Sequence, residues 1–85
     1  MKHAGEAALG AMQPMLILLR QLESIRERKP GVFYQKSSAF IHFHEDPAGI
    51  FADVRKDGEW LRLPVNTSPE RRRFVQLVRE ILASK

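Results

Sequence analysis

Two histidines separated by one residue are the feature of this 85-residue sequence with the most evident chemistry. In a strand, alternate side chains point to the same side, so His42 and His44 would project together. Imidazole nitrogens bind zinc and related ions, and a zinc site uses three or four protein ligands. Asp53 would be the third ligand if its strand pairs with the strand that carries the histidines.

The same residues also fit two other interpretations. In the one that we favour, Asp53 orients His42 and both are half-buried polar residues of an interface, because such groups are common on sheets. His42 and Asp53 also resemble two-thirds of a catalytic triad, with Ser37 or Ser38 nearby. Neither serine lies on a strand-to-helix elbow, and there is no glycine-rich oxyanion loop. We therefore expect no catalytic residue and no bound cofactor.

Length and composition narrow the class of protein. The chain carries 14 Lys and Arg against 10 Asp and Glu, a net charge of +4, and no cysteine. The length allows one small domain, and the lack of cysteine excludes disulfides, thiolate zinc sites and thiol catalysis. No apolar run reaches the roughly 20 residues of a membrane span or resembles a secretory signal. We expect a cytoplasmic protein that does not associate with membranes.

Periodicity and turn signals predict an α+β fold. Residues 1–11 are read as a frayed tail, and residues 12–85 as a single α+β domain. A first helix begins near Pro14 and ends at Lys29, and a last helix begins after Thr67, either with Ser68 as N-cap or with a Thr67/Glu70 capping box. Strands are predicted at residues 32–36, 39–45, 50–56 and 59–65. The order is α-β-β-β-β-α, a four-stranded antiparallel meander with both helices on one face.

The predicted turns determine which side chains share a face of the sheet. Two-residue turns at Ser37-Ser38 and Asp57-Gly58 and a loop over residues 46–49 place His42 opposite Asp53 and Phe33 opposite His42. The face toward the helices then holds Val32, Tyr34, Ile41, Phe43, Ile50, Ala52, Val54, Leu61, Leu63 and Val65. The opposite face holds the candidate ligand or interface residues Phe33, Phe40, His42, His44, Phe51, Asp53, Arg55, Trp60 and Arg62.

Four large aromatic side chains on that second face suggest that something covers it. A monomer rarely leaves such a patch exposed. The sequence therefore predicts a non-enzymatic binding or structural protein that forms a homodimer through this face, or holds a ligand there. The alternatives are nucleic-acid or anionic-partner binding through helical arginines, and a metal-dependent or hydrolytic enzyme centred on His42, His44 and Asp53.

The candidate anion-binding residues are Arg72, Arg73 and Arg79 of the last helix. With Arg26, Arg28 and Lys29 they would form a phosphate-binding patch. Acidic residues are interleaved with them, which is typical of a solvated face. Residues 37–66 hold three basic and five acidic residues, so the aromatic face is locally acidic. Nucleic-acid binding is accordingly not the favoured interpretation.

Residues 29–54 read KPGVFYQKSSAFIHFHEDPAGIFADV. This segment resembles a family of short, uncharacterised bacterial proteins with the pattern KPGxFYxKSxAFxHFHEDPAGxFADV followed by a final helix. The resemblance covers roughly residues 29–82 and implies a bacterial, cytoplasmic protein, with no activity to carry over. A fainter likeness links the chain to the YjbR-like α+β proteins, which also have a meander between helices.

Overall fold

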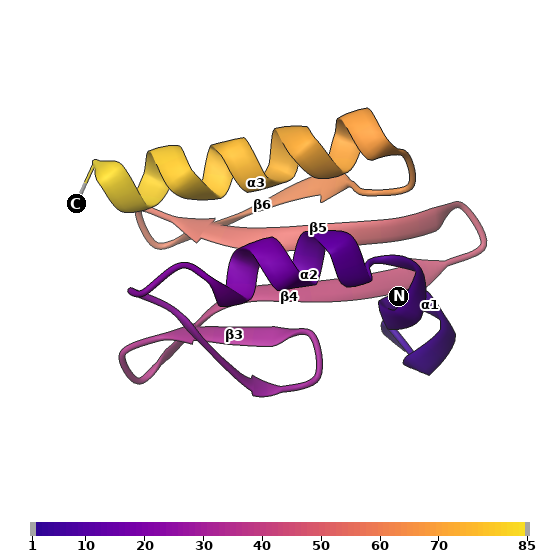
Figure 1. The fold of residues 1–85 in the computed structure, drawn as a ribbon, viewed down its shortest axis with the longest axis horizontal. Coiled ribbons are helices and arrows are strands. Elements are labelled where there is room, and N and C mark those ends of the chain that lie inside the picture. Colours follow the sequence, from indigo (N-terminus) through magenta and orange to yellow (C-terminus); the bar gives the residue numbers. More distant parts are fainter. Residues whose placement is uncertain (1, 85) are drawn as a thin grey trace.

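The computed structural model describes residues 2–84 and has an α+β fold, in which three helices cover one face of an antiparallel sheet of six strands within that range (Figure 1). The elements are β1 (Lys2–His3), α1 (Glu6–Ala11), α2 (Gln13–Arg20), β2 (Arg26–Lys29), β3 (Val32–Gln35), β4 (Ser38–Asp46), β5 (Gly49–Lys56), β6 (Glu59–Pro64) and α3 (Ser68–Ala83). None of the described helices is long and apolar enough to span a bilayer.

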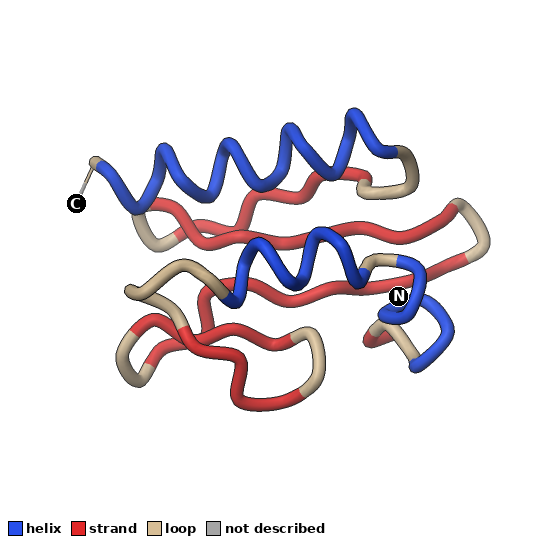
Figure 2. Tube along the Cα trace, in the orientation of Figure 1, coloured by secondary structure: helices blue, strands red, loops and turns tan. Residues whose placement is uncertain are grey.

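The sheet has the strand order β2-β3-β4-β5-β6, so five strands follow one another as a meander. The two longer helices, α2 and α3, lie side by side over the same face, as the sequence predicted (Figures 1 and 2). Between helices and sheet lies the core, made of Met12, Met15, Leu16, Leu19, Ile25, Phe33, Phe40, Ile41, Phe43, Ala52, Val54, Val65, Phe74, Val75, Val78 and Ile81.

Residues 2–11 are part of the fold, where the sequence indicated a frayed tail over residues 1–11; residue 1 lies outside the described residues. Strand β1 pairs with the second half of β4, which extends beyond the end of β3. The backbone N–H of Ala4 donates to the carbonyl of Phe43 at 3.1 Å, and that of Gly5 donates to Glu45 Oε2 at 2.8 Å. The edge of β4 that β3 leaves unpaired therefore binds an N-terminal segment whose sequence has no clear strand alternation.

The predicted end of the first helix is wrong. Helix α2 ends at Arg20, and residues 26–29 form strand β2, which pairs with β3 around a turn at Gly31. The strand carries only charged side chains, which protect a sheet edge but give no alternating apolar signal. Glu27 fixes this strand to the helix by accepting from Arg20 Nε at 2.6 Å, and to the turn by accepting from the N–H of Gly31 at 2.9 Å.

The predicted register of the first hairpin is wrong by one residue. Phe33, not Tyr34, lies opposite Ile41. The turn residues are Lys36 and Ser37, with Lys36 at φ 57°, which shifts the pairs next to the turn by two residues, and an extra residue in β4 at Phe40 reduces the shift to one at Phe33. A one-residue slip moves every side chain of a strand to the other face. Phe33 is consequently 0% exposed in the core, and the predictions that placed it outside and Tyr34 inside are both corrected.

Phe40 is also in the core rather than on the opposite face. The register of β4 shifts between its pairs with Phe33 and Tyr34, which marks a bulge at Phe40. A bulge interrupts the alternation of the strand, so Phe40 and Ile41 are both buried although they are consecutive. The four-aromatic surface predicted from strict alternation is therefore reduced to Phe51 and Trp60.

The other two hairpins have the predicted registers. His42 lies opposite Asp53, and Asp53 lies opposite Arg62. Asp57 and Gly58 both have positive φ, as a type I′ turn requires. Of the two N-cap alternatives for the last helix, the capping box forms: Thr67 Oγ1 accepts from the backbone of Glu70, whose side chain accepts from the backbone N–H of Thr67.

Candidate functional site: a histidine–aspartate cluster

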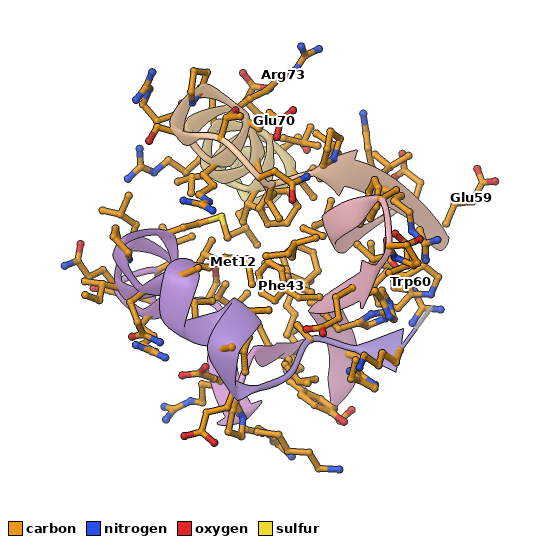
Figure 3. All side chains as sticks on the ribbon, turned by 90° about the vertical axis from the view of Figure 1, so that its right-hand side faces the viewer. Met12, Phe43, Glu59, Trp60, Glu70 and Arg73 are labelled. Carbon is orange, nitrogen blue, oxygen red and sulfur yellow. The ribbon has the colours of Figure 1, made fainter. Side chains whose placement is uncertain are left out.

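A cluster of polar side chains from four strands lies on the face of the sheet opposite the helices. His3 comes from β1, His42 and His44 from β4, Asp53 from β5 and Arg62 from β6. Figure 3 shows Trp60 on the same side, with the sheet between it and the buried Met12 and Phe43. The meander brings these residues together because consecutive antiparallel strands keep facing residues adjacent.

Three donor atoms of the cluster converge on one point. His42 Nδ1 lies 2.7 Å from His44 Nε2, His44 Nε2 lies 2.9 Å from Asp53 Oδ2, and His42 Nδ1 lies 3.7 Å from that oxygen. A circle through the corners of this triangle has a radius of about 1.9 Å. An ion displaced by less than about 1 Å from the plane would be 2.0–2.1 Å from all three atoms, the zinc–imidazole distance.

His44 Nε2 lies within hydrogen-bond distance of two other atoms, His42 Nδ1 and Asp53 Oδ2. If His44 Nε2 carries a proton, that N–H faces both His42 Nδ1 and Asp53 Oδ2. If His42 Nδ1 were also protonated, two N–H groups would meet at 2.7 Å. If the proton is on His42 Nδ1 instead, the lone pairs of His44 Nε2 and Asp53 Oδ2 face each other at 2.9 Å. With both nitrogens deprotonated, a cation between the three atoms would satisfy all three contacts.

Asp53 is held in place from its other side by Arg62. The guanidinium donates from Nε to Oδ1 at 2.8 Å and from its terminal nitrogen to Oδ2 at 2.9 Å, a bidentate pair. Burial by itself would raise the pKa of Asp53, which is 3% exposed, but the Arg62 hydrogen bonds and the neighbouring positive charges lower the pKa below its ordinary value. Asp53 is therefore an ionised carboxylate of fixed orientation.

The environment keeps the first histidine neutral. Burial lowers the pKa of His42, and His44, His3 and Arg62 add to the effect, against the opposing influence of Asp53. A neutral imidazole is the form that coordinates metal ions. Sequence reasoning paired His42 with Asp53, but the closer partner of that carboxylate is His44.

His3 completes the group and was missed by the sequence analysis, which placed it in the tail. It lies opposite His44 in the ladder, and its ring centroid is 5.5 Å from that of His44 and 6.0 Å from that of His42. No local signal identifies a two-residue strand, because its pairing depends on the free edge of β4. The one signal in the sequence was that His3 is the remaining histidine of the three in the chain.

Other predicted site residues border the cluster. The Trp60 ring centroid is 4.4 Å from that of His42, and Arg55 stacks on the outer face of the indole at 5.2 Å. Phe51 is half-buried and lies opposite His44 in the ladder. Ser37 lies in the turn between β3 and β4 and Ser38 is the first residue of β4, away from the cluster, so the triad raised as an alternative is not assembled.

The basic residues do not form the patch that the sequence raised as an alternative. Arg72, Arg73 and Arg79 are exposed on α3, which packs near β5 and β6. Arg26, Arg28 and Lys29 belong to β2, at the other edge of the sheet. Arg71 instead caps the chain before α3 by donating from Nε to the carbonyl of Val65 at 2.9 Å. The sheet therefore separates the two basic groups by its full width.

Comparison of the chain with protein-family models, curated proteins and solved structures gives no match. The resemblance to the short bacterial proteins and to the YjbR-like group accordingly stays a prediction.

Proposed function

We propose that this protein binds a divalent transition-metal ion of the zinc class through His42, His44 and Asp53. The observation that carries the proposal is the convergence of three donor atoms on a point about 1.9 Å from each. We place this interpretation ahead of the interface that the sequence favoured, because three atoms of metal-ligating type lie within 3.7 Å of one another.

The donor types define the class of ion. Two imidazole nitrogens and one carboxylate oxygen suit zinc, copper, nickel and iron. Magnesium and calcium prefer sites made of oxygen ligands, so they are poor matches. Arg62 supports the proposal as an outer partner that holds the ligating carboxylate, a common arrangement around bound metals. Its positive charge also limits affinity for the cation, which favours ions that bind imidazole strongly.

Calorimetric titration of the tag-free protein with Zn²⁺ tests the proposal. We expect one ion per chain, and at least a tenfold loss of affinity in His42→Ala and in His44→Ala. Glu59→Gln, which removes an exposed carboxylate of β6, is the matched control and should bind as the wild type does. Circular dichroism confirms that each variant is folded. Absence of heat above dilution, or equal binding by the double variant H42A/H44A, would contradict the proposal.

A homodimer is the second candidate. The sequence predicted it through the aromatic face of the sheet, whereas the exposed apolar residues and the free strand edge favour β6. Trp60 and Leu61 are consecutive on β6 and are 40% and 36% exposed. The outer edge of β6 has no partner strand among the described residues. A second copy would cover both. Sedimentation velocity tests this, since Trp60→Ala should shift a wild-type dimer toward monomer, and a wild-type monomer at high concentration would exclude it.

We also propose that the protein is bacterial and cytoplasmic, as the resemblance to the short bacterial proteins implies. It assigns no catalytic role to any residue. The metal site and the proposed dimer surface adjoin each other, because Arg62 of β6 holds Asp53 and Trp60 of β6 lies beside His42.

A further inference from the structure

Three protein ligands leave one position of a tetrahedral ion to be filled. In structural sites a fourth side chain fills it, whereas catalytic sites keep it for water or substrate. The identity of the group in this position therefore decides what class of site the cluster forms. One further imidazole, that of His3, lies beside the cluster.

The position of His3 suits the fourth ligand. In an imidazole complex the ring centroid lies about 3 Å from the ion, so two rings on one tetrahedral ion have centroids about 5 Å apart. His3 is 5.5 Å from His44 and 6.0 Å from His42 by this measure, and His42 and His44 are 4.7 Å apart. Because the His3 side chain is exposed, a change of rotamer can close the remaining distance without displacing core residues.

The backbone around His3 is fixed more firmly than its side chain. Its strand pairs with β4, and the two amides that follow donate to Phe43 and Glu45. The ion pair of Lys2 with Glu45, at 3.7 Å, adds an exposed contact on the same strand. Because the fold already orders this segment, less conformational entropy is lost when the imidazole coordinates the ion.

We propose that His3 is the fourth ligand, so that the bound ion closes the site and ties the N-terminal strand to β4. This inference rests on the proposed metal site. It makes the site a closed centre of three histidines and one aspartate, in which the N-terminal segment, and not a water molecule, occupies the last position. The ion then acts as a clasp between β1 and the two central strands.

Cobalt is the probe for the test, because Co²⁺ substitutes for zinc and its visible spectrum reports coordination. Azide is the second probe, because it binds an ion that has an open or water-filled position. We expect the Co²⁺ spectrum of the wild type to be unchanged by azide. We expect His3→Ala to bind Co²⁺ at least tenfold more weakly and to change its spectrum on addition of azide. Glu6→Ala, an exposed residue at the start of α1, is the control and should behave as the wild type.

The outcomes separate the inference from the proposed function. If the wild type binds no Co²⁺, the proposed metal site itself is wrong. If the wild type binds Co²⁺ but H3A binds it with equal affinity, or if azide changes both spectra alike, His3 is not a ligand and the three-ligand site stands.

Hydrogen exchange gives a second readout that does not depend on azide. Zn²⁺ should slow exchange of the Ala4 and Gly5 amides in the wild type and leave it unchanged in H3A. Equal slowing in both proteins would overturn the inference.

Discussion

His3 lies directly opposite His44 in the β1–β4 ladder, so the last residue of the short strand β1 lies beside the polar cluster. The pairing exists because β4 continues past the end of β3 and offers a free edge. It links the start of the chain to Asp53, to which His44 is hydrogen-bonded at 2.9 Å. The cluster therefore extends over four strands, from β1 to Arg62 on β6.

Metal binding should stabilise the fold. An ion that binds only the native state adds RT ln(1 + [L]/Kd), about 2.7 kcal/mol when its concentration is 100 times Kd. We expect Zn²⁺ to raise the melting temperature of the wild type and to leave that of His44→Ala unchanged. Thermal unfolding followed by circular dichroism measures both. An equal shift in the two proteins would indicate binding elsewhere.

Trp60 should report occupation of the site by quenching. It is the only tryptophan of the chain, and its ring centroid is 4.4 Å from that of His42. Bound Cu²⁺ at this range quenches indole emission, so we expect saturable quenching with one ion per chain. Asp53→Asn should weaken it. The protein unfolded in urea is the control, and quenching of equal strength and saturation there would show that the folded cluster is not responsible.

The corrected register of the first hairpin predicts which aromatic residue supports the core. Phe33→Ala should lower the free energy of unfolding by about 3–5 kcal/mol, the usual cost of deleting a buried phenyl ring. Tyr34→Ala should cost about 1 kcal/mol, because Tyr34 is half-buried and its ring contact with Arg28 is at the surface. Urea denaturation measures both, and Phe33→Leu serves if the alanine variant does not fold. A larger loss for Tyr34→Ala would restore the register expected from the sequence.

The contact between Arg20 and Glu27 should make stability depend on pH. The hydrogen bond from Arg20 lowers the pKa of Glu27 below its ordinary value of 4.5, although burial opposes this effect. The unfolded chain then takes up the proton first, so this stabilisation is complete above about pH 4.5 and is lost as the pH falls through the folded-state pKa.

Glu27→Gln tests this linkage. We expect the variant to be about 1 kcal/mol less stable than the wild type at pH 7, with the difference shrinking toward pH 3. Urea denaturation at the two pH values gives the comparison, and Glu23→Gln, in the loop before β2, is the control. A difference that is the same at both pH values would show that the carboxylate charge contributes nothing.

Much of the fold could be predicted from local signals. The β4–β5–β6 registers followed from well-marked turns, and the Thr67/Glu70 capping box was among the two N-caps expected for α3. These features depend on residues within a few positions of one another. His42, Asp53 and Arg62 were thereby correctly placed in one row across three strands.

The failures have a common physical cause. Strand β2 consists of the charged residues of an edge, β1 is two residues long, and Phe40 lies at a bulge. The partner of β1 is distant in sequence, whereas β2 and the bulge belong to local hairpins but break the alternation of apolar and polar residues, so neither apolar periodicity nor turn propensity reveals these features. The unpredicted bulge at Phe40, together with the misplaced turn at Lys36, put Phe33 on the surface in the prediction although it lies in the core.

The sequence by itself determined the α+β class, the two central hairpins and the alignment of His42 with Asp53, because turn chemistry and strand alternation act locally. Only the tertiary structure decided that Phe33 and Phe40 belong to the core, and that His3 joins the histidines. Those outcomes depend on which sheet faces and strand edges remain uncovered after the meander has formed. Packing of the whole chain determines which segments cover them.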